Sequence, residues 1–362
     1  MLDDTLLGDP AALVALDTAG VLRAAATAGA QVRSAAQSAL DVGVGDLAGT
    51  RPRALVLLRR PGASTSATGM ITALVGAAGA VPIVVADTVP SWIGPLDVVV
   101  GHTADAEDTE LADSVALAVR RGAEVVLSAP ADGPVASAGA GRVRLVEQRI
   151  PVPPGLDLPR ALTVALTTVS ALGLLPVPLE PGMDVLADVL DTEAERNQPG
   201  HEPFMNPAKS LALRLADHTP LLWGADPVAA AVAEHAAGSL AAHAGVVAHA
   251  SDVARGAALP GLLRLLEQVA SHDVFHDPFD DPAEAQAPPA RLVLIGTAEE
   301  DPGQVALRRT GRPFPSADVV HPVDEVARGV RHAALLRAAL LASRFDAAAV
   351  YLGLATRTIA PA

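Results

Sequence analysis

Residues 97–119, DVVVGHTADAEDTELADSVALAV, are the stretch that decides the fold. The apolar run predicts a buried strand over 97–101, and apolar residues at helical spacing predict a helix over 110–121. A short turn between a strand and a helix presents backbone N–H groups that bind phosphate, helped by Gly, Ser and Thr. Here the turn is acidic and includes Asp105 and Asp108. The strand–turn–helix architecture predicts an anion site, but the negative charges of Asp105 and Asp108 would repel an anion.

Two interpretations of this acidic turn stay open. Carboxylates suit hard cations, so Asp105, Glu107 and Asp108 could hold Mg²⁺ or Ca²⁺. Alternatively, Asp108 or Thr109 caps the helix, and the helix dipole favours the acidic neighbours. We expect the capping interpretation, because acidic helix N-termini are far commoner than metal sites.

Further strands and helices alternate on both sides of this stretch. Strands are predicted at 54–58, 81–86 and 124–128, a polar loop at 59–68 and helices at 9–39 and 69–78. This alternation predicts an α/β fold, namely two doubly wound domains with mainly parallel sheets. Ligands of such sheets bind beyond the carboxyl ends of the strands. The loops 60–66 and 103–108 are therefore the predicted site.

The pattern returns after two proline-rich breaks, PVPPGLDL at 151–158 and PVPLEPG at 176–182. The breaks predict domains over 1–150 and 201–362, joined by a helical connection over 151–200. In the second domain strands are predicted at 220–224, 246–248, 291–296 and 318–321. Helices are predicted at 159–174, 183–196, 206–216, 227–243, 262–271, 301–309 and 326–355.

Composition narrows the function classes. The 362 residues carry a formal net charge of −15, which argues against nucleic acid and anionic membranes as partners. No cysteine is present, and Lys209 is the only lysine, so arginine is the expected anion ligand. The uncharged stretches 61–86 and 161–179 are interrupted by Pro, Ser and Thr and are expected to be buried elements. The acidic start, MLDDT, is no secretory signal, so a cytoplasmic protein is expected.

Clusters that resemble metal sites are weak. HDVFHDPFDD at 272–281 could ligate a divalent ion, but its prolines favour a solvated loop. His235, Ser239 and His243 share one helix face, where packing is the commoner explanation. No P-loop, GxGxxG or GxSxG motif is found. We expect no metal and no cofactor.

Five segments in order resemble one family, the SIS-type phosphoglucose/phosphomannose isomerases of bacteria and archaea. The segments are PSWIGPLDVVVGHTADAEDTELADSVALAVRRGAEVV (90–126), PPGLDLPRAL (153–162), NPAKSLALRLADHTPLLWG (206–224), FHDPFDDP (275–282) and LRAALLASRFDAAAVYLGLA (336–355). More narrowly, the chain is similar to alanine-rich actinobacterial members labelled TobH. The resemblance implies aldose–ketose isomerisation of glucose 6-phosphate or mannose 6-phosphate, and a homodimer.

The resemblance also implies where functional residues should lie. The Gly-Gly-Ser loop of the family falls on Gly62–Ser64, and its hydroxyl-rich phosphate loop falls on Thr103–Asp108. Two hydroxyl positions of that loop have become Asp105 and Asp108. The arginine that stabilises the enediolate falls on Arg160 and is retained.

Other family features are missing. The base motif falls on Ala242–Gly245 without its carboxylate, and neither the ring-opening motif (expected in 251–261) nor the C-terminal lysine helix has a counterpart. Loss of a general base typically slows a reaction about 10²–10⁴-fold. We therefore expect a catalytically degenerate SIS protein that binds a sugar phosphate or another small polar ligand, or regulates a partner. The alternatives are an active isomerase with His243, His249 or Glu234 as base, and an acidic loop that docks a cationic partner.

Overall fold

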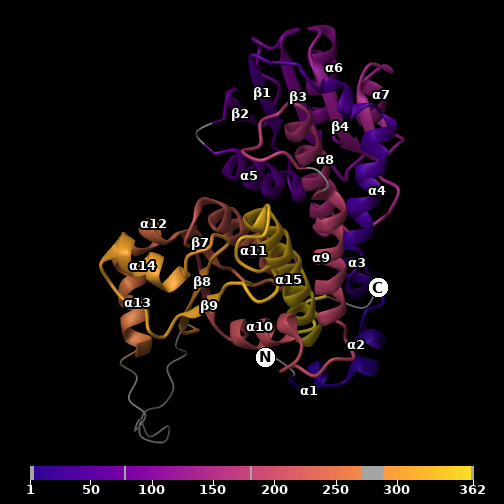
Figure 1. Ribbon diagram of the computed structural model, residues 1–362. Coiled ribbons are helices and arrows are strands. Elements are labelled where there is room, and N and C mark those ends of the chain that lie inside the picture. The colour runs from indigo at the N-terminus through magenta and orange to yellow at the C-terminus, as the bar shows by residue number, and fades with distance from the viewer. Residues whose placement is uncertain (1–3, 77–78, 180–181, 271–287, 360–362) are drawn as a thin grey trace, which may run out of the picture. The chain divides into compact units, whose positions relative to one another are not determined.

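The computed structural model describes residues 4–76, 79–179, 182–270 and 288–359 (Figure 1). The chain divides into two compact units. Residues 23–195 form the N-terminal unit, and residues 1–22 together with 196–362 form the C-terminal unit. These units do not coincide with the domains 1–150, 151–200 and 201–362 predicted from the proline-rich breaks.

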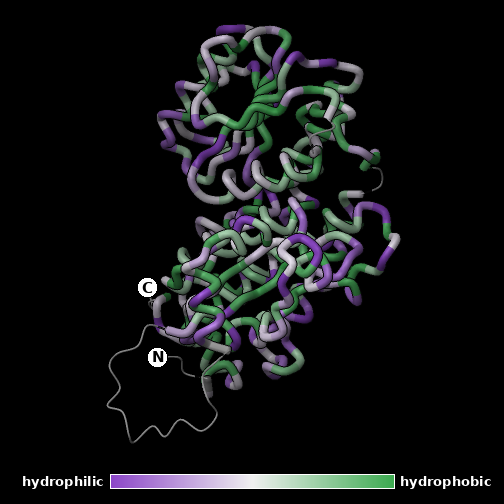
Figure 2. The backbone as a smooth tube through the Cα atoms, turned by 90° about the vertical axis from the view of Figure 1, so that its left-hand side faces the viewer, coloured by the Kyte–Doolittle hydropathy of each residue, from purple (hydrophilic) through white to green (hydrophobic). Residues whose placement is uncertain are grey.

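The N-terminal unit is built on a five-stranded parallel sheet in the order β2-β1-β3-β4-β5. The two central strands β1 and β3 are buried along their whole length. Figure 2 accordingly shows green, hydrophobic strands at the centre of this unit. The strands are β1 (Ala54–Leu58), β2 (Ile83–Ala86), β3 (Asp97–His102), β4 (Glu124–Ala129) and β5 (Arg144–Glu147).

Helices cover both faces of this sheet. Val56, Val99 and Val125 pack with α6 and α7 in one core, and alternate residues face α5 and α8 on the other side. The helical elements are α3 (Val21–Ala25), α4 (Ala28–Asp41), η1 (Val44–Leu47), α5 (Ala63–Val75), α6 (Thr109–Arg120), α7 (Pro134–Ala138), α8 (Leu158–Ala171) and α9 (Gly182–Arg196). The predicted doubly wound α/β layer is present.

The C-terminal unit has a four-stranded parallel sheet in the order β7-β6-β8-β9. Its strands are β6 (Thr219–Gly224), β7 (His249–Asp252), β8 (Ala290–Ile295) and β9 (Asp318–Val320). Its helices are α1 (Asp4–Leu7), α2 (Pro10–Leu16), α10 (Pro207–Leu215), α11 (Pro227–Ala244), α12 (Val253–Ala257), α13 (Pro260–Ala270), α14 (Pro302–Thr310) and α15 (Ala333–Ala355). Four of these helices begin with an Asp or Asn cap followed by proline, a strong start signal.

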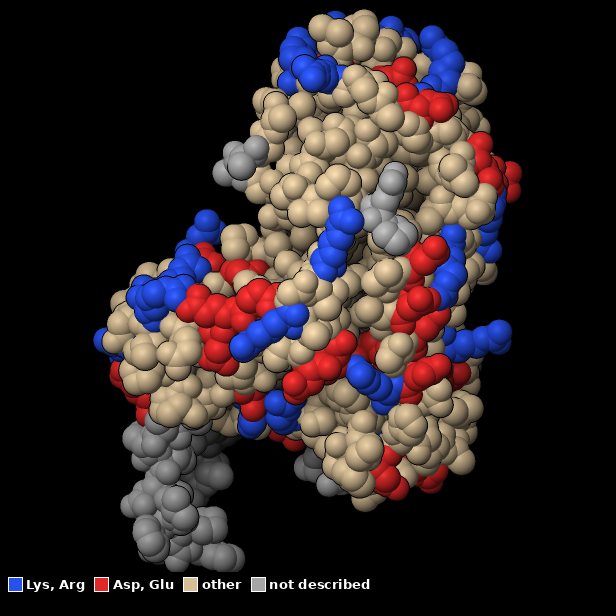
Figure 3. Space-filling model, in the orientation of Figure 1, with Lys and Arg blue, Asp and Glu red and all other residues tan. Residues whose placement is uncertain are grey.

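The long helix α15 packs on α10 and α11. Among the described residues it is the helix whose length and composition would allow a membrane span, but 94% of its most apolar window is buried inside the protein. Its apolar character is explained by this central position. On the face shown in Figure 3, acidic and basic side chains are interspersed over the surface.

Two predictions of local structure are wrong. Residues 59–68 are not all loop, because α5 already begins at Ala63, after Gly62 with φ +85°. Ala63 and Ala67 are buried, so packing outweighs the low helix propensity of the neighbouring Ser and Thr residues. The strand predicted at 246–248 lies at 249–252 instead, because Gly245 ends α11 in the left-handed conformation and the following residues form the connection.

Further short elements were not predicted. They are α1, η1, β5, α7 and α12, which have only four or five residues each. The helical region predicted over 9–39 is broken into α2, α3 and α4. At the first break the carboxylate of Asp17 accepts hydrogen bonds from the backbone of Val21 and Leu22 and starts a new helix.

The only lysine, Lys209, holds segments of the C-terminal unit together by hydrogen bonds. Lys209 is fully buried, and its ammonium donates to the carbonyl oxygens of Leu7 (2.7 Å), Pro199 (2.7 Å) and His201 (2.9 Å). It also lies 5.5 Å from the ring centroid of Tyr351. Burial lowers the pKa of the Lys209 ammonium. Three segments distant in sequence thus depend on one cation.

Replacing this cation should destabilise the C-terminal unit. Lys209→Met leaves three carbonyls without their donor, which costs about 3 kcal/mol. Urea unfolding followed by Trp223, in a Trp92→Phe background, measures the loss in this unit. The matched control is Arg255→Met, whose side chain is 86% exposed and which should change stability by less than about 0.5 kcal/mol. If Lys209→Met lowers the free energy of unfolding as little as the control does, the stabilising role of the Lys209 ammonium is contradicted.

Candidate functional site

The candidate site of the N-terminal unit lies at the carboxyl ends of β1 and β3, the central neighbours of its sheet. The loop after β1 carries Arg60, and the loop after β3 carries Asp108. The Arg60 guanidinium donates two hydrogen bonds to the Asp108 carboxylate, from Nε and Nη2, each 2.8 Å long. A third, from Nη1 to Glu110, is 2.6 Å long. The crevice where doubly wound sheets bind ligands is therefore crossed by a salt bridge.

Asp108 also caps the helix that follows it. Its Oδ1 accepts a hydrogen bond from the backbone N–H of Leu111 at 3.0 Å, and α6 begins at Thr109. The capping interpretation of the acidic turn is confirmed. No group of three or more His, Asp or Glu that could hold a metal lies in the described ranges. The sequence cluster 272–281 lies outside the described residues.

The hydroxyl groups of the two loops are used internally. Ser64 is buried, and its Oγ donates to the carbonyl of Leu58 and accepts from the backbone N–H of Arg60. Thr103 Oγ1 accepts from the N–H of Asp105 at 3.0 Å. Asp105 Oδ1 accepts in turn from the N–H of Glu107 at 2.9 Å. These contacts hold the loops in shape and occupy the groups that a phosphate would need.

A buried network adjoins these loops. The His102 ring lies 2.9 Å from Ser128 Oγ through Nδ1 and 2.8 Å from Asp157 Oδ2 through Nε2. Arg160, on the first turn of α8, contacts Asp157 and the carbonyl of Thr103, both at 3.4 Å. Ser128, His102 and Asp157 are connected like a hydrolase triad, but Ser128 is fully buried. A substrate cannot reach it, so hydrolase chemistry is not supported.

The charges of this network follow from its burial. Burial lowers the pKa of the His102 imidazole, which favours the neutral ring. Burial alone would raise the pKa of Asp157, but the contacts with His102 and Arg160 outweigh it and hold the pKa at about 2. A carboxylate only accepts, so the neutral ring donates from Nε2 to Asp157 and accepts from Ser128 at Nδ1.

The predicted site residues thus fall into two groups. Gly62, Ser64 and Arg160, with Thr103, Asp105 and Asp108 of the acidic loop, lie in the N-terminal unit on or beside the strand ends. His243 and His249 lie in the C-terminal unit, at the amino-terminal edge of its sheet, where α11 ends and β7 begins. His249 accepts a hydrogen bond of 3.4 Å from Trp223.

Two contributors to the site, His102 and Asp157, were not predicted, and Arg60 lies in the predicted loop 60–66 but was given no role. Arg60 stands directly after a buried strand, where a cation could have been matched to the acidic loop. His102 is the last residue of β3, and Asp157 precedes Arg160 by three positions, on the same side of the start of a helix.

The predicted helix face His235, Ser239 and His243 packs against Asp346 of α15. His235 lies 2.9 Å and Ser239 Oγ 2.7 Å from Asp346 Oδ1, and all four side chains are buried. The packing interpretation of this face is therefore correct. Burial lowers the pKa of His243, and its Nε2 has no hydrogen-bond partner among the described residues.

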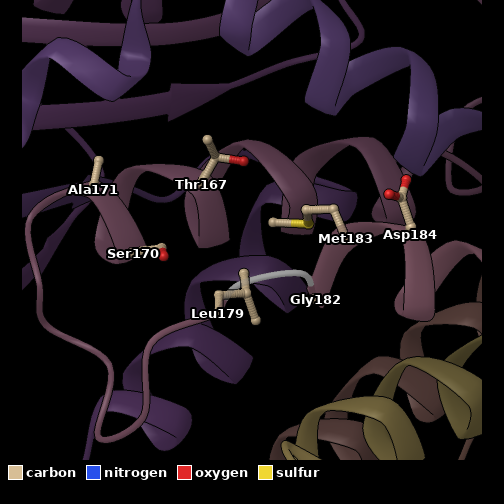
Figure 4. Close-up of a pocket in the computed structure, with 7 residues that line it drawn as sticks. All are labelled: Thr167, Ser170, Ala171, Leu179, Gly182, Met183 and Asp184. Carbon is tan, nitrogen blue, oxygen red and sulfur yellow. The ribbon is translucent and has the colours of Figure 1, made fainter.

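A pocket of about 370 Å³ lies where α8 ends and α9 begins (Figure 4). Thr167 and Ser170 line it from α8, and Met183 and Asp184 line it from α9. The Thr167 hydroxyl donates to the carbonyl of Thr163 in its own helix. None of the described residues that line the pocket is cationic, so this lining does not suit a phosphate.

Comparison with known proteins identifies the class of fold. A proposed phosphosugar isomerase from Silicibacter pomeroyi aligns with 94% of this chain and 98% of its own, at a TM-score of 0.61 and 13% identity. A proposed tagatose-6-phosphate ketose/aldose isomerase from Clostridium novyi aligns with 92% and 89%, at a TM-score of 0.58 and 10% identity. The C-terminal domain of glucosamine-fructose-6-phosphate aminotransferase from Francisella tularensis aligns with 92% and 96%, at a TM-score of 0.54 and 10% identity. At these identities the likeness shows the fold, which is that of the SIS phosphosugar isomerases.

The family model narrows the class. Residues 204–358 match the bacterial phospho-glucose isomerase C-terminal SIS domain. The C-terminal part of this SIS-fold chain is therefore similar to that domain. No curated protein matches the chain.

The buried pair of His235 and Asp346 predicts a pH dependence of stability. Burial alone would lower the pKa of His235, but Asp346 outweighs burial and raises it. A raised pKa in the folded state stabilises below the unfolded pKa of about 6.5, and this stabilisation is lost as pH rises through the folded pKa. His235→Gln should therefore destabilise the C-terminal unit more at about pH 5.5 than at about pH 9.

Urea unfolding at both pH values, followed by Trp223 in the Trp92→Phe background, provides the measurement. His201→Gln is the control, because His201 is exposed in the same unit. If His235→Gln lowers the free energy of unfolding equally at both pH values, the ion pair with Asp346 is contradicted.

Proposed function

We propose that this protein uses the SIS fold to bind a carbohydrate derivative or to regulate a partner, and that it does not isomerise sugar phosphates. The observation that carries the proposal is the Arg60–Asp108 salt bridge. A phosphate at the N-terminus of α6 would occupy the position where Asp108 accepts from Leu111, and it would meet the negative charge of Glu110. The nearby cation, Arg60, already binds both Asp108 and Glu110.

The other groups of the loops support the same proposal. The Ser64 and Thr103 hydroxyls already donate within the loops, to the carbonyls of Leu58 (2.9 Å) and Asp105 (3.4 Å), so a phosphate would have to displace those bonds. The carboxylate base expected near Ala242 is absent from the sequence, and His243 and His249 belong to the C-terminal unit, at the amino-terminal edge of its sheet. The homodimer, the cytoplasmic location and the narrower likeness to TobH-labelled proteins stay predictions.

An active isomerase is the second candidate, and Arg160 favours it. This arginine stands where the family places its enediolate-stabilising arginine, and its Nε and Nη1 have no acceptor within the described part of the chain. An isomerase also needs a base, and among the described residues the one carboxylate or imidazole hydrogen-bonded to Arg160 is Asp157, which is itself bound to His102.

Turnover separates the two candidates. Purified full-length protein with glucose 6-phosphate or mannose 6-phosphate should show no interconversion above the uncatalysed rate. Product formation that disappears in Arg160→Met would establish the isomerase and contradict the proposal.

Opening the salt bridge should restore phosphate binding. Asp108→Ser keeps a helix cap and releases Arg60 from its main partner, so inorganic phosphate should bind the variant and not the wild type. At phosphate about tenfold above Kd the stabilisation is about 1.4 kcal/mol, a rise in Tm of about 4 °C. Asp105→Ser is the control, because it removes the same charge without touching Arg60. A phosphate response that is equal in both variants would show that charge alone, not the salt bridge, closes the site.

A further inference from the structure

The amino-terminal edge of the N-terminal sheet carries exposed arginines that have no acidic partner. Strands β1, β3, β4 and β5 run parallel, so the segments that precede them meet at this edge. Four arginines there are exposed and form no ion pair with a described residue: Arg51 before β1, Arg120 and Arg121 at the end of α6 before β4, and Arg142 before β5. Such a group of unpaired cations is unexpected in a chain with 41 acidic and 26 basic residues.

The carboxylates that the strands bring to this edge are already paired. Asp97, the first residue of β3, is buried and accepts hydrogen bonds of 2.5 and 3.0 Å from the guanidinium of Arg53. Glu124, the first residue of β4, pairs with Arg144. These two acids therefore do not neutralise the four unpaired arginines.

Two exposed apolar side chains lie among these arginines. Trp92 is 44% exposed and Leu96 is 69% exposed, although only 2% of the chain is aromatic. The guanidinium carbon of Arg53 lies 5.2 Å from the centroid of the Trp92 ring, and the backbone N–H of Arg53 donates to the Leu96 carbonyl at 2.7 Å. A Cβ on Gly122 would lie 3.3 Å from Pro95 Cγ, so the loop before β3 contacts the turn before β4. We call the surface formed by Trp92, Leu96 and the four unpaired arginines the basic edge.

We propose that the basic edge binds an acidic protein segment that carries apolar side chains between its carboxylates. Guanidinium groups bind carboxylates in bidentate pairs, and exposed apolar side chains gain free energy when a partner covers them. Trp and Arg are among the residues most enriched at binding hot spots. The basic edge lies at the opposite ends of β1 and β3 from the Arg60–Asp108 salt bridge. The proposal therefore goes beyond the proposed function and does not depend on it.

The observations favour a protein segment over a nucleic acid. Single-stranded nucleic acids stack their bases on open aromatic faces, whereas Arg53 already covers one face of the Trp92 ring. The aliphatic side chain of Leu96 suits an apolar side chain of a partner. The formal net charge of −15 repels a long polyanion, but a short acidic segment can reach the basic edge without crossing the acidic remainder of the surface.

The probe is a fluorescein-labelled synthetic peptide in which the triplet Glu-Glu-Leu is repeated, titrated against the full chain by fluorescence anisotropy at low ionic strength. The wild type should bind it, and should not bind a peptide of repeated Lys-Lys-Leu. The double variant Arg120→Gln/Arg121→Gln should bind the acidic peptide about tenfold more weakly, because two charged contacts are lost.

The matched control is Arg308→Gln/Arg309→Gln, which removes the same charge from the end of another helix, α14. Both of these arginines already have acidic partners, Glu300 and Asp252, so this variant should bind like the wild type. No binding by the wild type, or equal weakening in both double variants, overturns the proposal.

A measurement on the wild type covers variants that do not fold. Peptide binding should move the Trp92 emission to shorter wavelength, whereas the fully buried Trp223 should give a constant signal. An unchanged spectrum at saturating peptide, or the same shift in Trp92→Phe, contradicts the role of Trp92 in the basic edge.

Two other occupants are tested alongside the peptide. If an oligothymidylate binds more tightly than the acidic peptide at equal ionic strength, the proposal fails and the basic edge is a nucleic-acid site. If sedimentation shows self-association that Arg120→Gln/Arg121→Gln abolishes, the proposal also fails, because a second copy of the chain then covers this surface. Isomerase turnover would refute only the proposed function, since peptide binding is read without a sugar phosphate.

Discussion

Between the carboxyl ends of β1 and β3, the guanidinium of Arg60 holds both oxygens of Asp108 at 2.8 Å. Asp108 at the same time caps α6, so one carboxylate fixes the start of the helix and neutralises the cation across the crevice. Both side chains are about nine-tenths buried, at 11% and 9% exposed, where a salt bridge is little screened by solvent. The conformation of both loops depends on this contact.

In the C-terminal unit a carboxylate likewise bridges two loops at the carboxyl ends of neighbouring strands. Asp226 caps α11 after β6, and its carboxylate accepts from the backbone N–H groups of Thr297 and Ala298 in the loop after β8. β6 and β8 are the central neighbours of that sheet, as β1 and β3 are in the other. In both units a carboxylate of the chain occupies the helix N-terminus where an α/β sheet would otherwise bind an anion. The two units have thus kept the fold and filled the same position.

Much of this could be predicted from the sequence, because buried parallel strands read as apolar runs and Asp108 precedes an amphipathic helix. The α/β class, the cap and the strand–turn–helix at 97–119 all follow from local pattern. The sequence places Arg60 at the same sheet edge as the acidic loop but does not identify Asp108 as its partner, since the long side chain crosses between loops 48 residues apart. The start of α5 depends on burial of Ala63 and Ala67, and the polar edge strand β7 has no apolar run to reveal it. Local pattern predicts elements, whereas long side chains and packing decide how the site is closed.

The most direct test is a crystal structure determined after soaking with glucose 6-phosphate, examined at the N-terminus of α6. The account predicts that Arg60 keeps both hydrogen bonds to Asp108 and that no phosphate lies against the backbone of Leu111. A phosphate bound there, with Arg60 turned from Asp108 toward it, would contradict the central claim that the chain's own carboxylate has taken the place of the ligand.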